Sequence, residues 1–169
     1  MAGSSEVILG VDPGSIRTGF GLIQCSDIGI RHLSHGTIVL DKRKALADRL
    51  RDLAVDLHTV VERYQPTQAV VEDVFYHKNA RAALTLGQAR GAVLGILGLK
   101  GILVHGLTPT EIKSLITGAG RAKKFQVASI VAFELHIAVP ASPDSSDALA
   151  IALAQALKNN GQQKKLIHE

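Results

Sequence analysis

Cysteine is nearly absent from this sequence, and so is any pattern typical of export. The single cysteine among the 169 residues, Cys25, cannot form an internal disulfide, which fits a reducing compartment. The first residues, Met1–Ser5, are small and polar, without the basic and apolar regions of a signal peptide. We therefore expect a cytoplasmic protein.

A hydrophobic run long enough to cross a membrane is also missing. The longest apolar region, Gly91–Leu107, is interrupted by Lys100 and by several glycines, whereas a membrane-spanning helix needs about 20 consecutive apolar residues. The chain is 46% apolar and 20% charged, as in ordinary globular proteins. We expect one domain over residues 1–169, with its own core and no membrane partner.

Two common catalytic arrangements are absent as well. No stretch matches the Walker A pattern GxxxxGK[ST], because "TGAGRAKK" at residues 117–124 has the glycines without a following serine or threonine. The seven histidines form no cluster with metal-ligand spacing, and Cys25 has no histidine near it in sequence. P-loop chemistry and catalysis by a nucleophilic side chain are therefore not supported.

Basic residues are concentrated in the middle of the chain, and the net charge is +4. Between residues 78 and 124 the one acidic residue is Glu111, whereas basic residues recur, among them Lys78, Arg81, Arg90, Lys113, Arg121, Lys123 and Lys124. Lysine and arginine displace the counterions condensed on phosphates, so such a stretch favours a polyanionic partner such as nucleic acid. A solvated positive face has the same pattern.

The order of apolar runs and turn residues predicts an α/β fold. Strands are expected at 7–12, 19–24, 67–72 and 101–104, and a further strand after the second one ends with residues 36–40. The short loops between the first three strands make these antiparallel. Helices are expected at 42–64, 79–98, 110–115, 125–136 and 145–157, with a frayed polar tail at 159–169. This order implies a five-stranded mixed sheet with helices on both faces.

The expected helix at 79–98 contains glycine at every fourth position. Gly87, Gly91 and Gly95 would leave a groove along one side, although each costs a helix about 1 kcal/mol relative to alanine. Close approach of another backbone would compensate for this cost. The pattern alone favours packing on the protein's own sheet, and contact with a second subunit is the alternative.

Four acidic residues occupy unusual positions. Asp12 ends the apolar stretch "VILGVD", and Glu72 ends the apolar stretch "AVVE". Asp144 and Asp147 open the last helix three residues apart and therefore share a face. If the first and fourth strands are parallel neighbours, Asp12 and Glu72 leave the sheet at the same end. The start of the last helix would then bring its two aspartates to them.

Four converging carboxylates would repel one another unless cations lay between them. Oxygen ligands suit Mg²⁺ or Mn²⁺ rather than zinc, and two such ions about 4 Å apart can activate a water and stabilise the leaving oxygen of a phosphodiester. Singly, Asp12 could be a turn residue and Asp144 a helix N-terminal charge. Glu72 gains little structurally at a buried strand end, and together the four predict a site for divalent metal.

Three segments resemble a known family: "ILGVDPGSIRTGFG", "VVEDVFYHKNARAALTLGQARG" and "PDSSDALAIALAQA". From about Val7 to Leu157 the sequence is similar to the RuvC family of Holliday-junction resolvases. The resemblance implies an RNase H-like fold and a Mg²⁺-dependent endonuclease, with two ions per site and Mn²⁺ as a substitute. It implies paired symmetric nicks in four-way junctions that leave 5′-phosphate and 3′-hydroxyl ends. The implied catalytic and metal-binding residues are Asp12, Glu72, Asp144 and Asp147.

The same resemblance extends to DNA contacts and partners. The candidate DNA-binding residues are Phe75, Lys78, Arg81, Lys113, Lys123 and Lys124. Phe75 matches a family aromatic that stacks on bases, and Lys113 and Lys124 match lysines that meet the phosphate backbone. The family is homodimeric, which favours a subunit contact along the glycine-bearing helix, and it works with branch-migration proteins of the RuvA and RuvB type.

Two other functions fit part of the sequence. An ATPase or phosphotransferase of related fold also opens with a strand and an Asp-x-Gly loop, but it needs two domains around its nucleotide, and 169 residues are too few. A non-catalytic junction-binding protein would not need all four acidic residues. We therefore expect a structure-specific endonuclease of recombination and DNA repair.

Overall fold

The structure, a computed structural model, describes residues 5–73 and 79–167, with side chains up to residue 161. Its strands are β1 Glu6–Asp12, β2 Arg17–Ser26, β3 Gly29–Val39, β4 Gln68–Glu72 and β5 Leu103–Leu107. Its helices are α1 Leu46–Tyr64, α2 Ala80–Leu99, α3 Pro109–Thr117, α4 Lys124–Glu134 and α5 Pro143–Ile167. All of these elements correspond to elements expected from the sequence, with several changed boundaries.

The strands form one sheet in the order β3-β2-β1-β4-β5. β1 pairs antiparallel with β2, and β2 pairs antiparallel with β3. β4 runs parallel to both β1 and β5. The predicted five-stranded mixed sheet is confirmed, and so is the parallel pairing of the first and fourth strands on which the convergence of Asp12 and Glu72 depended.

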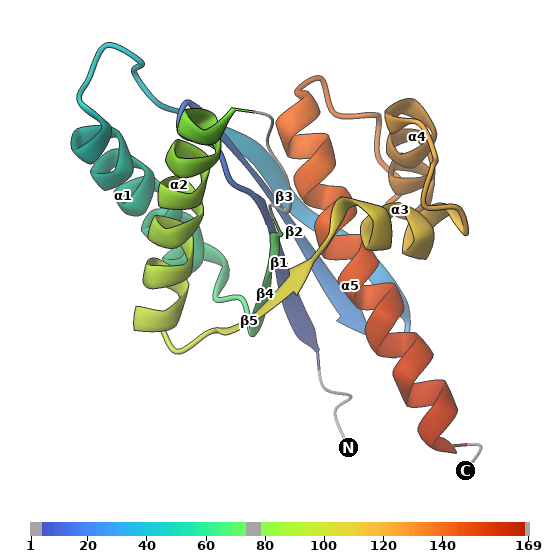
Figure 1. Cartoon of the computed structure of the whole chain (residues 1–169). Coiled ribbons are helices and arrows are strands. Elements are labelled where there is room, and N and C mark those ends of the chain that lie inside the picture. Colours follow the sequence, from blue (N-terminus) through green and yellow to red (C-terminus); the bar gives the residue numbers. More distant parts are fainter. Residues whose placement is uncertain (1–4, 74–78, 168–169) are drawn as a thin grey trace.

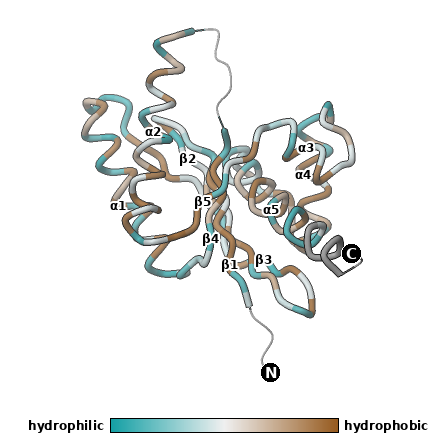
Figure 2. The backbone as a smooth tube through the Cα atoms, turned by 60° about the horizontal axis from the view of Figure 1, so that its bottom comes forward, coloured by the Kyte–Doolittle hydropathy of each residue, from teal (hydrophilic) through white to brown (hydrophobic). Residues whose placement is uncertain are grey.

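Helices cover both faces of this sheet (Figure 1). Because successive side chains of a strand point to opposite faces, Ile8 packs in a core formed with α3, α4 and α5, whereas its neighbour Leu9 packs in a core formed with α1 and α2. Apolar residues accordingly concentrate in the strands at the centre of the molecule (Figure 2). The acidic strand ends lie at the border of the α3–α5 layer.

Helix α5 lies very close to the sheet because glycines face it from β1 and β2. A Cβ atom on Gly10 would lie 2.2 Å from the backbone oxygen of Ala148, and one on Gly21 would lie 2.7 Å from the backbone nitrogen of Leu149. Alanines recur on the buried side of the helix, including Ala152, which would also meet a Cβ on Gly10. This close packing fixes where the first turn of α5 meets the strand ends.

The largest differences from the predicted boundaries concern β3 and α5. β3 begins at Gly29, whereas the sequence pattern predicted only its last part, residues 36–40, and most of its residues are only half-buried. It pairs with β2 alone and contains a register shift opposite Leu22 and Ile23, so no clean apolar alternation marks it. The predicted end of the last helix at residue 157 was wrong, because α5 continues to Ile167.

One smaller boundary change has a local cause. α1 begins at Leu46 rather than at residue 42, because the side chain of Asp41 accepts hydrogen bonds from the backbone and guanidinium of Arg43 and holds a turn there. At the start of α2 the predicted cap is confirmed. The Oδ1 atom of Asn79 accepts hydrogen bonds from the backbone nitrogens of Arg81 and Ala82, at 3.0 and 3.2 Å.

Helix α2 is apolar but mostly uncovered. In the described part of the chain it is the one helix long and apolar enough to cross a membrane by length and composition, which alone is weak support for a membrane span. Gly87, Gly91 and Gly95 are exposed, and a Cβ atom added to any of them would have no neighbour within 4 Å. The expected packing of these glycines on the protein's own sheet was therefore wrong.

Candidate active site

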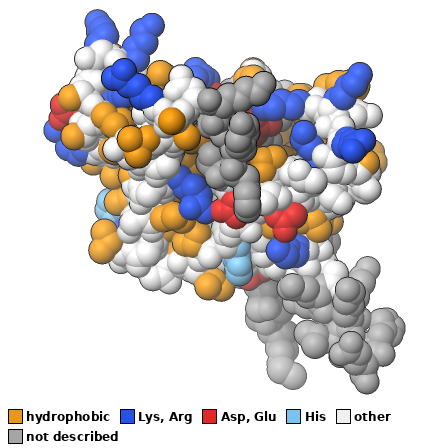
Figure 3. All heavy atoms as spheres, viewed as in Figure 1, with side chains coloured by type: hydrophobic (Ala, Val, Ile, Leu, Met, Phe, Trp, Pro, Cys, Tyr) orange, Lys and Arg blue, Asp and Glu red, His pale blue; other side chains and the backbone are white. Residues whose placement is uncertain are grey.

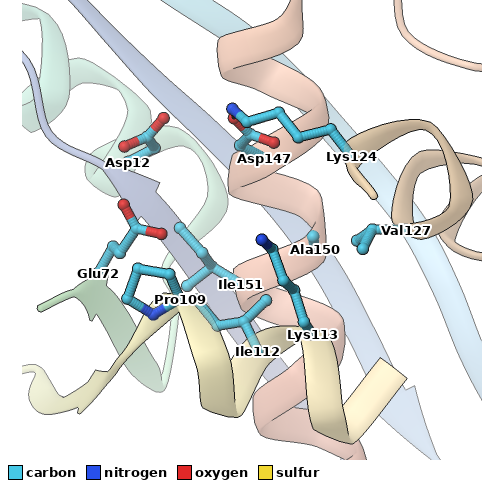
Figure 4. A pocket seen from close by; sticks show the side chains of 10 residues that line it. All are labelled: Asp12, Glu72, Pro109, Ile112, Lys113, Lys124, Val127, Asp147, Ala150 and Ile151. Atoms are coloured by element: carbon cyan, nitrogen blue, oxygen red, sulfur yellow. The ribbon is translucent and has the colours of Figure 1, made fainter. Parts of the chain in front are cut away.

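The ends of β1 and β4 bring two carboxylates together. In the parallel register Val11 lies opposite Val71, so the next residues, Asp12 and Glu72, leave the sheet side by side. Both strands are buried up to this point, and the two acidic residues are each partly exposed. The side chains of Asp12 and Glu72 point into one space beside α5 (Figure 4).

This space is a pocket of about 350 Å³ between the strand ends, α3, α4 and α5. Asp147, from the first turns of α5, adds a third carboxylate, and Lys113 and Lys124 add two ammonium groups (Figure 4). The full lining is Asp12, Glu72, Pro109, Ile112, Lys113, Lys124, Val127, Asp147, Ala150 and Ile151. Charged groups thus line a pocket whose other walls are apolar.

Burial and mutual repulsion make the ionised carboxylates of this pocket costly. Burial, together with the charges of Glu72 and Asp147, raises the pKa of Asp12 to about 7. The pKa of Glu72 is also raised, first by burial and then by the charge of Asp147. A cation between these groups would remove the repulsion, and the all-oxygen donor set is the one that Mg²⁺ and Mn²⁺ prefer.

A lysine supplies part of that compensating charge. The Nζ atom of Lys124 donates a hydrogen bond of 2.5 Å to Oδ2 of Asp147, and this bond raises the pKa of Lys124. Its positive charge also lowers the pKa of Asp12 and of Glu72 against the larger raising effects. Lys124 therefore interacts electrostatically with all three carboxylates of the pocket.

Asp144 does not line this pocket, although the sequence pattern predicted that it would converge with the other three. The Nε atom of Arg17 donates a hydrogen bond of 2.6 Å to Oδ2 of Asp144. Ser142 lies beside this pair, because its hydroxyl accepts a bond from Arg17 and lies 2.7 Å from the hydroxyl of Thr37. The charge of Asp144 still raises the pKa of Asp12, although less than the charges of Glu72 and Asp147 do.

The structure thus brings together three of the four predicted carboxylates. Among the residues described, no group of three or more His, Cys, Asp or Glu side chains is arranged as a ready set of metal ligands. Asp147 and Asp144 are each paired with a basic side chain. Both ion pairs involve partly exposed groups, which interact weakly, so either carboxylate can exchange its basic partner at small cost.

The other predicted DNA-binding residues are distributed unevenly. Lys113 and Lys124 line the pocket, whereas Lys123 does not, and its backbone nitrogen donates to Oε1 of Gln126 at the start of α4. Arg81 is exposed in the first turn of α2. Phe75 and Lys78 lie outside the described residues. Figure 3 shows acidic side chains near the middle of one face, with lysine and arginine side chains around them.

Helix α3, which carries Lys113, has a well-capped N-terminus. The hydroxyl of Thr108 accepts a hydrogen bond from the backbone nitrogen of Glu111, whose carboxylate accepts one from the backbone nitrogen of Thr108. This capping box, followed by Pro109 in the first turn, fixes the beginning of the helix. The sequence pattern predicted the proline position but not the box.

Sequence reasoning did not single out three residues that contact the predicted site. Arg17 pairs with Asp144, and Arg90 and Asp73 pair with each other directly behind Glu72. In the sequence, Arg90 is one of many basic residues in the middle of the chain. A charged pair "ED" after a buried strand was the available signal for Asp73, but nothing local in the sequence shows which basic residue faces it.

Comparisons with known proteins agree with this geometry. The family model described as "Crossover junction endodeoxyribonuclease RuvC" matches residues 8–155. A protein of that name from Citrifermentans bemidjiense is 39% identical over 150 residues, which cover 89% of this chain and 92% of that protein. One from Bdellovibrio bacteriovorus is 40% identical over 154 residues, covering 91% and 92%.

A solved structure shows the same fold. The structure titled "T. thermophilus RuvC in complex with Holliday junction substrate" superimposes with a TM-score of 0.86 at 28% identity, over 91% of this chain and 94% of that chain. Strand order and helix layers therefore match those of an RNase H-like nuclease, which confirms the predicted fold.

Proposed function

Because this chain belongs to the RuvC family of crossover junction endodeoxyribonucleases, we propose that it resolves four-way DNA junctions during recombination and repair. The family is one of metal-dependent nucleases that hydrolyse phosphodiester bonds, and a relative of the same fold has been solved with a Holliday junction. One observation carries the proposal for this chain. Asp12, Glu72 and Asp147 share a pocket with the two lysines Lys113 and Lys124.

The proposed catalytic and metal-binding residues are Asp12, Glu72, Asp144 and Asp147. Two Mg²⁺ ions, with Mn²⁺ as a substitute, would supply a nucleophilic water at neutral pH and stabilise the leaving 3′ oxygen. The raised pKa values of Asp12 and Glu72 support this role. Two carboxylates are rarely buried beside each other unless a positive charge compensates them. To bind the metal ions, Asp147 would break its ion pair with Lys124, and Asp144 would break its ion pair with Arg17.

Basic residues around the pocket are proposed to hold the DNA. Lys124, released from Asp147, and Lys113 both point into the pocket and could bind the oxygens of the phosphate to be cut (Figure 4). Lys78, Arg81 and Lys123 belong to the same basic part of the sequence and would contact other phosphates. Phe75 is proposed to stack on bases at the junction, and cleavage would leave 5′-phosphate and 3′-hydroxyl ends.

The active form is proposed to be a homodimer joined through α2. Gly87, Gly91 and Gly95 form an exposed stripe with open space above it, and Leu84 and Leu99 beside it are largely exposed. A second copy of the helix could approach this stripe closely, which the apolar surface favours. Two active sites in one dimer would cut opposed strands symmetrically.

Cytoplasmic location and docking with RuvA- and RuvB-type branch-migration proteins are part of the same proposal.

Cleavage of synthetic four-way junctions tests the proposal. We expect the purified protein to nick two opposed strands in Mg²⁺, to leave linear duplex of the same sequence intact, and to bind without cutting in Ca²⁺. We expect Asp12→Asn to bind junctions normally and to lose at least about 10³-fold in rate, as expected when a metal ligand is lost. Binding of junctions without cleavage in any metal would identify a non-catalytic binding protein instead, and equal cutting of duplex would identify a general nuclease.

A further inference from the structure

Arg90 lies behind the proposed active site, where α2 meets the end of β4. Its Nε atom donates a hydrogen bond of 3.2 Å to the backbone oxygen of Glu72. A terminal nitrogen of the same guanidinium donates to Oδ1 of Asp73 and forms an ion pair with it. One planar side chain thus holds two consecutive residues of the strand end, and an arginine fork does this with defined geometry.

Asp73 is itself held from the other side by β5. Its backbone nitrogen donates a hydrogen bond of 2.9 Å to the oxygen of Leu107. Its carboxylate lies over Gly106, where a Cβ atom would lie only 2.5 Å from Oδ2. The absence of a side chain at Gly106 therefore leaves the space that the Asp73 carboxylate occupies beside Arg90.

These contacts join three elements at one point. Arg90 comes from α2, Asp73 follows β4, and Gly106 and Leu107 belong to β5. The Arg90 and Asp73 side chains are only 27% and 32% exposed, so their ion pair is better shielded from solvent than the pair of Lys124 with Asp147. Glu72 is the last residue of the buried strand β4 and directly precedes Asp73 in the chain.

We propose that Arg90 is a positioning residue for the nuclease reaction, and that with Asp73 it forms a clamp that fixes the direction of the Glu72 carboxylate. The inference depends on the proposed function, since it assumes that Glu72 is a ligand of the catalytic metal. A carboxylate at the end of a strand can adopt several orientations, and metal binding must select one of them. Residues that hold the strand end in place restrict these orientations before the metal binds. The clamp also attaches the strand end to the helix proposed to carry the subunit contact.

Four variants test the clamp in the full-length protein: Arg90→Met, Arg90→Lys, Asp73→Asn, and the double variant Arg90→Met with Asp73→Asn. We expect Arg90→Met to lower the single-turnover cleavage rate by about 10- to 100-fold and to raise the Mg²⁺ concentration for half-maximal rate, which is the usual effect of losing a group behind a metal ligand. Junction affinity in Ca²⁺ should stay within about twofold of wild type. Mn²⁺ binding without DNA, followed by electron paramagnetic resonance, should weaken in parallel.

The remaining variants separate a clamp from other roles. Arg90→Lys should restore little, because an ammonium group cannot hold the Glu72 oxygen and the Asp73 carboxylate at once. The double variant should lose no more than Arg90→Met alone, because both single changes break the same interaction. If Arg90→Met does not fold, Asp73→Asn keeps the shape of the side chain and gives the same comparison with a smaller expected loss.

Glu62→Gln is the matched control. It removes the 2.6 Å ion pair between Glu62 and Lys100, which joins the other end of α2 to α1, and should leave rate and metal dependence unchanged. Wild-type metal dependence in the Arg90 and Asp73 variants, or an effect confined to junction affinity, would overturn the clamp. Glu72→Gln tells the two failures apart: if it still cuts junctions, the proposed function of the site is wrong, and if it is inactive while Arg90→Met is normal, only the clamp is wrong.

Discussion

Asp12 occupies a position that stabilises the uncharged form of its side chain. The carboxyl group is mostly buried at the end of β1, and Glu72, Asp147 and Asp144 all oppose its ionisation, so its pKa rises to about 7. In the unfolded chain this pKa is near 3.8. Between these two values the folded protein binds a proton that the unfolded chain releases. In the absence of a bound cation, this cluster of carboxylates therefore lowers the stability of the fold at neutral pH.

The metal-free protein should consequently lose stability as pH rises from about 4 to about 7, because a folded-state pKa above the unfolded value stabilises the fold only while the group is protonated. The slope for a single group is at most about 1.4 kcal/mol per pH unit. Urea unfolding in EDTA across this range measures it, and Asp12→Asn, which carries no charge at any of these pH values, should show a shallower decline. Parallel curves for the two proteins would contradict the prediction. The raised pKa of Glu72 acts in the same direction in wild type.

At the scale of elements, the position of α5 depends on contacts that leave no room for a methyl group. A Cβ atom on Gly10 would lie 2.2 Å from the oxygen of Ala148 and 2.6 Å from the nitrogen of Ala152. Both are backbone atoms of a buried helix and cannot rotate away. The helix would have to move as a unit, and Asp147 would move with it away from the strand ends.

Gly10→Ala should therefore destabilise the fold by about 1–3 kcal/mol, as inserted methyl groups do in packed cores, and should also slow junction cleavage. The matched control is Gly161→Ala at an exposed position in the last part of α5, where an added Cβ has no neighbour within 4 Å and alanine favours the helix. Urea unfolding and single-turnover cleavage measure the two effects. A Gly10→Ala protein as stable and active as Gly161→Ala would show that α5 is packed more loosely than these distances indicate.

The sequence predicted elements whose signals are local. The apolar run ending at Asp12, the run ending at Glu72 and the cap at Asn79 each carry their own pattern, and all three lie where expected. β3 lacked such a pattern, since an edge strand half in solvent needs no regular apolar face. The direction of the Asp144 side chain could not be predicted either, because it depends on Arg17, 127 residues earlier in the chain.

The two helical layers of the molecule differ in how completely their helices are covered. The layer of α3, α4 and α5 encloses a core and lines the pocket, whereas in the other layer α2 buries only three of its side chains, Ala89, Val93 and Leu97, among the residues described. The glycine stripe on its outer side meets no part of the chain that the structure describes. In an isolated molecule these glycines would weaken the helix without compensation, and this supports the subunit contact proposed for α2.

Gly91→Leu, in the middle of the stripe, should therefore separate folding from assembly. Leucine has open space there and favours a helix by up to about 1 kcal/mol over glycine, so the folded monomer should be at least as stable as wild type, while a closely packed dimer should be lost. Sedimentation velocity should then show monomers, and a plasmid with an extruded cruciform should be nicked once rather than cut on opposed strands together. Thr59→Leu, an exposed change on α1, should leave dimers and paired cutting intact. A Gly91→Leu protein that remains dimeric would place the subunit contact elsewhere.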